Sequence, residues 1–144
     1  MMQIREANDY EKEQLVELVK RIEDDSKKEE VLKTIDAELQ EGELKTFVAV
    51  NQDQILSYGI FNKQDDETGE IVFVGTDAYF RNNGYGAEVV NHIESYAKER
   101  MLKKLFLKAS AKNKKSLCFW IENEYEFQSR SEKSGLDYYL GKCL

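Results

Sequence analysis

The segment of this sequence best suited to chemistry is the loop RNNGYGA, from Arg81 to Ala87. Before it comes a run of β-branched and aromatic residues that is typical of a strand, and after it the apolar residues have helical spacing. Glycine allows close approach to the backbone and any φ, and the first turn of a helix presents unpaired N–H groups at the positive end of the helix dipole. We therefore predict that the loop binds an anion, usually a phosphate group.

Three phosphate-binding motifs are alternatives for this loop. The P-loop needs Lys-Ser or Lys-Thr after its glycines, and neither Gly84 nor Gly86 is followed by such a pair. The dinucleotide-binding fingerprint needs a third small residue, but Val89 stands in that place. The third motif is the acetyl-coenzyme A (acetyl-CoA) loop of the GNAT superfamily of acetyltransferases: Arg or Gln, any two residues, Gly, any residue, then Gly or Ala. The segment from Arg81 to Gly86 matches it, and so the loop resembles the coenzyme loop of that superfamily.

A glutamate upstream of the loop carries a closer resemblance. EIVF, beginning at Glu70, is followed fourteen residues after the glutamate by GYGA and then by NHI, which resembles the histone-acetyltransferase branch of the superfamily. In that branch a glutamate on this strand is the general base, so the resemblance implies this role for Glu70. A carboxylate can deprotonate an amine through a water when burial raises its pKa toward neutrality. The apolar residues after Glu70 indicate partial burial; the alternative is that Glu70 only ends the solvated loop DDETGE.

The same resemblance implies further coenzyme contacts. Val74, Gly75 and Thr76 would lie beside the pantetheine arm, whose amides need backbone partners as an added strand would. Gly75 interrupts a β-branched and aromatic run, which is typical of a bulge or of a close ligand. Near the start of the fourth predicted helix Asn113 and Ser116 match the superfamily pattern, and Phe119 is expected to pack against the sheet or the coenzyme arm. The candidate coenzyme-binding residues are therefore Val74, Gly75, Thr76, Arg81, Asn82, Asn83, Gly84, Tyr85, Gly86, Ala87, Asn113, Ser116 and Phe119.

The fourth predicted helix departs from the superfamily pattern. A tyrosine seven residues after the asparagine often protonates the departing thiolate, and here that residue is Trp120; the usual Gly-Phe pair is Glu124-Tyr125. Tyr138 and Tyr139 in the last strand could supply a phenol instead, although aromatic strand residues ordinarily belong to the core. The group that protonates the thiolate, and turnover itself, therefore stay open.

The elements that must position these residues resemble a GNAT domain along the whole chain. The pattern predicts the order β-α-α-β-β-β-α-β-α-β-β, which favours a single α/β domain over residues 1–144 with a mixed, largely antiparallel sheet flanked by helices. Three stretches are predicted in most detail. A charged run, EDDSKKEE, is expected to separate the first two helices; a hairpin should turn at Asn51 to Asp53; and a strand should run from Glu70 to about Phe80.

Several core positions follow from the helical spacing. Amphipathic helices need apolar residues at steps of three and four on the face that packs against the sheet. The predicted inward-facing residues are Leu15, Leu18, Val19 and Ile22 in the first helix, Val31, Ile35 and Leu39 in the second, Val90, Ile93, Ala97 and Met101 in the third, and Cys118 in the fourth. A closing hairpin is expected to turn near Ser134 and Gly135.

Composition narrows the class of partner and the compartment. The chain has 144 residues, 41% of them hydrophobic and 34% charged, with a net charge of −7 and a pI near 4.9. This acidity argues against a nucleic-acid partner and mildly favours a cationic one. One histidine and two separated cysteines, Cys118 and Cys143, argue against a metal site and favour free thiols in the cytoplasm. The N-terminal segment lacks an apolar signal region, and no run is long enough for a membrane span.

Taken together, the residues and the resemblance predict an N-acetyltransferase. Acetyl-CoA would be the acetyl donor and coenzyme A the product, with a primary amine attacking directly in a ternary complex. The acceptor stays open among a protein lysine, a protein N-terminus, a polyamine and an antibiotic, and a homodimer is neither indicated nor excluded. Two alternatives are an acyl-CoA-binding module without turnover and a structural or interaction domain whose loop is empty.

Overall fold

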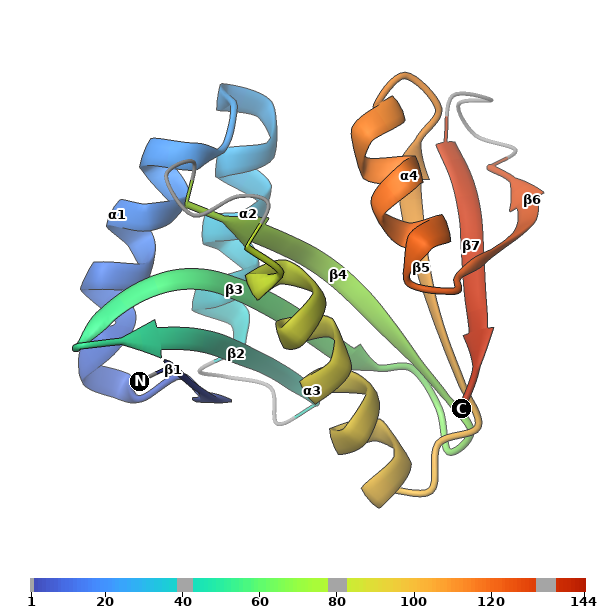
Figure 1. Ribbon diagram of the computed structural model, residues 1–144, viewed down its shortest axis with the longest axis horizontal. Helices are drawn as coiled ribbons and strands as arrows, with labels where there is room; N and C mark the ends of the chain where they lie inside the picture. The colour runs from blue at the N-terminus through green and yellow to red at the C-terminus, as the bar shows by residue number, and fades with distance from the viewer. Residues whose placement is uncertain (1, 39–42, 78–82, 132–136) are drawn as a thin grey trace.

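A seven-stranded sheet is the frame of the molecule (Figure 1). The computed structural model describes residues 2–38, 43–77, 83–131 and 137–144. The strands are β1 (Met2–Glu6), β2 (Leu44–Asn51), β3 (Gln54–Lys63), β4 (Thr68–Thr76), β5 (Lys104–Ser110), β6 (Glu126–Arg130) and β7 (Asp137–Cys143), and they lie in the order β1-β2-β3-β4-β5-β7-β6. All neighbouring strands pair antiparallel except β4 and β5, which are parallel. The predicted single domain with a mixed, largely antiparallel sheet is confirmed.

Helices cover both faces of this sheet (Figure 1). They are α1 (Lys12–Ile22, preceded by a 3-10 turn at Asp9–Glu11), α2 (Asp25–Glu38), α3 (Tyr85–Glu99) and α4 (Lys114–Glu122). The first two pack on one face, where Val19 and Val31 join a core with Val48 and Ile60. The last two pack on the other face, in a core of their own that includes Ile93. Each amphipathic helix thus buries its apolar side against the sheet, as the spacing predicts.

The parallel strands β4 and β5 separate after a short paired stretch. Their register covers only Thr68–Glu70 opposite Lys104–Phe106. Immediately beyond, β4 carries a bulge at Val72, because Phe61 of β3 lies opposite Ile71 while Ile60 lies opposite Phe73. A bulge bends its strand and increases the local twist. In Figure 1, β4 and β5 meet near the C-terminus and then spread apart.

Two predicted boundaries differ from the structure near the site. The charged run Glu23–Glu30 does not separate α1 from α2, because α2 begins at Asp25. Asp24 caps it: the Lys27 N–H donates to Asp24 Oδ1 at 2.9 Å, and acidic residues at a helix start are favoured by the helix dipole. The strand predicted from Glu70 is β4, which starts two residues earlier at Thr68 and ends at Thr76; residues 78–80 lie outside the described residues.

Two predicted core residues are exposed. Met101 follows the end of α3 with φ of 67° and is 80% exposed, while Leu102, 4% exposed, takes the core place. Cys118 is exposed on the outer side of α4, and both cysteines are free thiols. Leu39 and the turn of the closing hairpin, Ser134 and Gly135, lie outside the described residues.

The remaining predicted elements are found. The hairpin between β2 and β3 turns at Gln52 and Asp53, whose φ values of 52° and 65° are the left-handed conformation that a two-residue hairpin turn requires. None of the helices in the described ranges is long and apolar enough to cross a membrane.

Candidate active site

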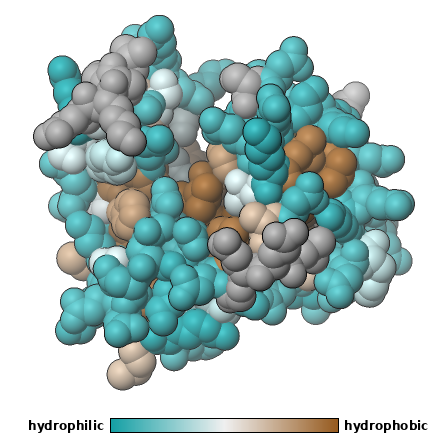
Figure 2. All heavy atoms as spheres, turned by 180° about the vertical axis from the view of Figure 1, so that it is seen from behind, coloured by the Kyte–Doolittle hydropathy of each residue, from teal (hydrophilic) through white to brown (hydrophobic). Residues whose placement is uncertain are grey.

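The separation of β4 and β5 opens a cleft of about 990 Å³. One wall is β4 from Glu70 to Val74, and the other is β5 from Leu107 to Ser110 together with the start of α4. Seen from the side of α1 and α2, hydrophobic side chains lie at the bottom of a hollow that hydrophilic ones surround (Figure 2). A cleft of this size with an apolar floor is typical of a site for a large cofactor.

Glu70 lies where the cleft begins, as the last β4 residue paired with β5. Its side chain is half-buried, and Gln64 Nε2 donates a hydrogen bond to Glu70 Oε1 at 3.2 Å. Burial raises the pKa of the Glu70 carboxyl, and the positive charge of Lys108 opposes that rise. The partial burial expected from sequence is therefore present, and Glu70 lines the cleft.

The glycine loop lies at the start of α3. Gly84 is the N-cap residue of this helix with φ of 79°, and a Cβ built on it would have no described atom within 4 Å. A Cβ on Gly86 would lie 3.3 Å from Thr76 Oγ1 and 3.5 Å from Phe119 Cε1. Gly84 thus has a left-handed backbone conformation and lies beside open space, whereas Gly86 lies where β4, α3 and α4 meet. Arg81 and Asn82 lie outside the described residues.

The three predicted contacts on β4 lie in different surroundings. Val74 lines the cleft, whereas Thr76 Oγ1 lies 3.1 Å from Ser57 Oγ on the neighbouring strand. Gly75 is regularly paired with Tyr58, so of the two alternatives expected there, a bulge or a close ligand, the bulge is wrong; the bulge is at Val72. A Cβ on Gly75 would lie 2.5 Å from Tyr58 Cε1, which shows that packing on the α1 side requires this glycine.

Helix α4 contributes the wall opposite β4. Asn113 is its N-cap and accepts a hydrogen bond from the Ser116 N–H at 3.0 Å, and both residues line the cleft. Phe119 is half-buried beside Gly86, and its ring packs edge-on against Trp120. Trp120 itself lines the cleft and packs edge-on against Tyr125. The predicted residues Ala87, Gly86 and Phe119 therefore lie in one region at the junction of α3 and α4.

Charged residues also line the cleft walls, and of these Lys108 was not among the sequence candidates. Asp24, Lys27 and Glu30 line it from the side of α2, and Lys108 lines it from β5. Side chains alternate along the segment KKLFLKAS, so Lys108 points to the face of the sheet away from its buried neighbour Leu107. Only the strand order shows that this outward face borders the cleft.

Parallel strands that separate, a bulge beside a half-buried carboxylate and a glycine N-cap on α3 characterise this α/β domain. A family model, the acetyltransferase (GNAT) family, matches residues 8–123. The chain belongs to the GNAT acetyltransferase family.

Solved structures agree on the fold. PaiA N-acetyltransferase from Thermoplasma acidophilum in complex with coenzyme A is 13% identical, with a TM-score of 0.83 over 100% of this chain and 99% of that one. The ribosomal-protein-S18-alanine N-acetyltransferase from Escherichia coli is 12% identical, with a TM-score of 0.78 over 99% and 94%. A GNAT acetyltransferase from Elizabethkingia anophelis with acetyl-CoA bound is 16% identical, with a TM-score of 0.75 over 99% and 98%. No curated protein sequence matched the chain.

Proposed function

We propose that this protein is an N-acetyltransferase that moves an acetyl group from acetyl-CoA to a primary amine by direct attack in a ternary complex. The observation that carries the proposal is the cleft between β4 and β5, which has Glu70 at its start and the glycine loop near its end. Family membership supports the reaction class.

The residues around the cleft fit the coenzyme. Pairing between β4 and β5 ends at Glu70, so the β4 edge from Ile71 to Val74 presents backbone groups that can pair with the pantetheine amides. The first N–H groups of α3 have no acceptor within the helix and suit the pyrophosphate. The proposed coenzyme contacts are those expected from sequence: Val74, Gly75, Thr76, Arg81, Asn82, Asn83, Gly84, Tyr85, Gly86, Ala87, Asn113, Ser116 and Phe119. When bound, the coenzyme would supply an acetyl group activated as a thioester.

Glu70 would act on the acceptor. An amine is mostly protonated at neutral pH and attacks only as the free base. Glu70 would accept a proton from the ammonium group, directly or through one water, so that the nitrogen forms the new C–N bond as the C–S bond breaks. A pKa raised by burial makes the carboxylate a stronger base than an exposed glutamate, provided that it stays ionised.

The departing thiolate has a different environment from the one the family pattern describes. Trp120 lines the cleft, but an indole N–H is a hydrogen-bond donor that does not ionise in this pH range. Tyr138 and Tyr139 are not among the described residues that line the cleft. We therefore assign protonation of the thiolate to none of these three side chains.

The proposal is tested by two measurements on the same protein. Acetyl-CoA should raise the melting temperature, by an amount equivalent to about 2.7 kcal/mol at a hundred times Kd. Release of coenzyme A should then be detected with at least one amine from a panel of polyamines, aminoglycosides and peptides bearing a lysine or a free N-terminus. Stabilisation without turnover would instead favour an acyl-CoA-binding module. No stabilisation would favour a structural domain.

We also propose that the acceptor is cationic, and the salt dependence of its KM should show this. The whole chain has a net charge of −7, and the carboxylates Asp24, Glu30 and Glu70 line the side of the cleft formed by α2 and β4. Most lysines of the lining lie on the other wall, along β5 and at the start of α4. Because salt screens such charges, KM for the acceptor should rise as ionic strength increases. Glu30→Gln should weaken this dependence, whereas Glu29→Gln, an exposed α2 residue outside the cleft lining, should not. A KM that is insensitive to salt would contradict steering by these carboxylates.

A further inference from the structure

A lysine on the second strand of the cleft faces the proposed base. We propose that Lys108 is a positioning residue for the reaction, whose ammonium group keeps Glu70 in the ionised form that can accept the proton of the acceptor. This inference rests on the proposed function of Glu70 as the base.

The register of β4 and β5 places the two side chains on one face of the sheet. Glu70 pairs with Phe106, and residues in register on parallel strands point to the same side. Side chains alternate along β5, so Lys108 shares the face of Phe106, while Leu105 and Leu107 are buried on the opposite face with α3 and α4. Glu70 and Lys108 both line the cleft. Lys108 is therefore the first β5 side chain on this face beyond the last pair with β4.

The electrostatic environment of Glu70 supports an influence of Lys108 on its carboxyl group. Burial is the larger influence and raises the pKa of Glu70, while the charge of Lys108 is the influence that lowers it. The other polar contact to the carboxylate, from Gln64, is neutral. Among the described residues Lys108 has no direct ion-pair partner, Glu70 included, so its charge acts on Glu70 across the cleft and is not compensated by a closer carboxylate.

The other charged groups around the cleft belong to different elements. Asp24, Lys27 and Glu30 line it from the side of α2. Asp24 accepts from the first turn of that helix. Lys27 Nζ lies 3.4 Å from Glu23 Oε2 and 5.9 Å from the centre of the Phe73 ring, so it is engaged away from Glu70.

The opposite wall carries a second group of charges. Lys112, Lys114 and Lys115 lie at the start of α4, and Asp137 lies at the start of β7, opposite Ser110 in the register with β5. Of all these charges, that of Lys108 is the one that lowers the pKa of Glu70. A substitution at Lys108, compared with one at another lysine of the cleft, therefore tests the inference.

The experiment measures the ionisation of Glu70 without requiring turnover. Carboxyl ¹³C chemical shifts are followed against pH in the coenzyme-free protein, with the Glu70 signal assigned by its loss in Glu70→Gln. In Lys108→Met the titration midpoint of Glu70 should move to higher pH, because the charge that favours the carboxylate is gone. Lys108→Arg should keep the wild-type midpoint, and so should Lys112→Met, a matched change on the same cleft.

The kinetic arm tests the role in the reaction. In Lys108→Met the acidic limb of the kcat/KM profile should move to higher pH together with the titration midpoint, and KM for a cationic acceptor should not rise, because a repelling charge has been removed. An unchanged Glu70 midpoint would overturn the inference whatever the activity. A midpoint that moves while the rate profile stays fixed would overturn the role of Lys108 in the reaction and would point to failure of Glu70 as the base.

Discussion

Glu70→Gln should lower the rate of acetyl transfer near neutral pH by about 100-fold or more. Glutamine keeps the shape of the side chain and its hydrogen bonding with Gln64, but it cannot accept a proton. Affinity for acetyl-CoA should change little, because the loss concerns the acceptor. The activity that remains should rise with pH, since free amine and hydroxide replace the lost base. Steady-state rates across pH, with coenzyme affinity measured separately, test this.

A matched variant separates the base from general charge effects. Glu67→Gln makes the same chemical change in the same acidic loop, at an exposed residue whose carboxylate pairs with Lys103 at 3.3 Å. It should keep wild-type rates. If Glu70→Gln also kept wild-type turnover and an unaltered pH profile, Glu70 would be only the end of a polar loop, and the proton would have to leave by another route.

Stability should respond to Glu70→Gln in the opposite direction from activity. The pKa of Glu70 is raised in the folded protein, so this carboxyl begins to cost stability as the pH rises above its unfolded-state pKa, and the cost is complete above the raised pKa. At neutral pH the glutamine variant should therefore melt no lower than the wild type. Any advantage should vanish in acid, where the glutamate is protonated in both the folded and unfolded states. A rate that falls without a fall in melting temperature excludes misfolding as the cause.

Local patterns predicted the elements because each helix and strand buries a face that its own spacing defines. The burial of Val90 and Ile93 in α3 and the position of the hairpin turn before Gln54 were predicted without information on the rest of the chain. Met101 was mispredicted because helical spacing continues past Glu99, although the chain turns there through a left-handed residue. Such ends are set by tertiary contacts, here by Leu102 entering the core.

Candidate site residues could be selected from the sequence only where they belong to a motif that is continuous along the chain. Glu70 was selected by the resemblance of EIVF, GYGA and NHI to the histone-acetyltransferase branch, and the loop by its glycines directly before a helical pattern. Their roles stay predictions. The packing role of Gly75 was not predicted, because the atoms that exclude a side chain there belong to Tyr58 and to Glu23, which are distant in sequence. Lys108 could not be singled out, since its relation to Glu70 depends on β5 being the parallel neighbour of β4.

The two glycines of the proposed coenzyme loop disfavour a side chain for different structural reasons. Gly84 has φ of 79°, so a β-branched residue there would strain the backbone, whereas asparagine tolerates this conformation. Its side chain would enter space that no described atom occupies within 4 Å of the Cβ. At Gly86 the nearest atoms are the ends of the Thr76 and Phe119 side chains, so a larger residue presses on the junction of β4, α3 and α4. A side chain added at Gly84 or at Gly86 should therefore obstruct the proposed phosphate site while leaving most core contacts intact.

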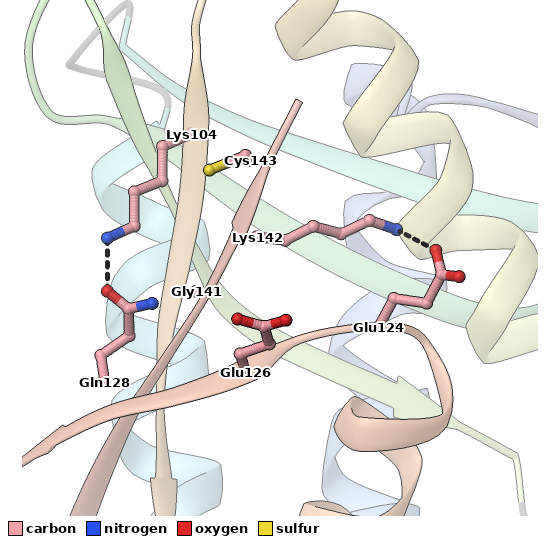
Figure 3. A pocket seen from close by; sticks show the side chains of 7 residues that line it. All are labelled: Lys104, Glu124, Glu126, Gln128, Gly141, Lys142 and Cys143. Atoms are coloured by element: carbon pink, nitrogen blue, oxygen red, sulfur yellow. Dashed lines mark hydrogen bonds and ion pairs between the residues drawn. The ribbon is translucent and has the colours of Figure 1, made fainter.

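Gly84→Asn and Gly86→Val should each weaken acetyl-CoA binding by about 10- to 100-fold, the effect of losing one charged hydrogen bond to a phosphate. Their melting temperatures without coenzyme should fall by only a few degrees. Gly141→Ala is the control, because it also adds a Cβ at a glycine but lies in a groove with Lys104 and Gln128, outside the cleft (Figure 3). Its Cβ would meet the ends of those two flexible side chains, and it should keep wild-type affinity. Calorimetric titration with acetyl-CoA measures all three variants. Unchanged affinity in folded Gly84→Asn and Gly86→Val would remove the loop from the coenzyme site, because a backbone that holds the pyrophosphate cannot accept both side chains without loss.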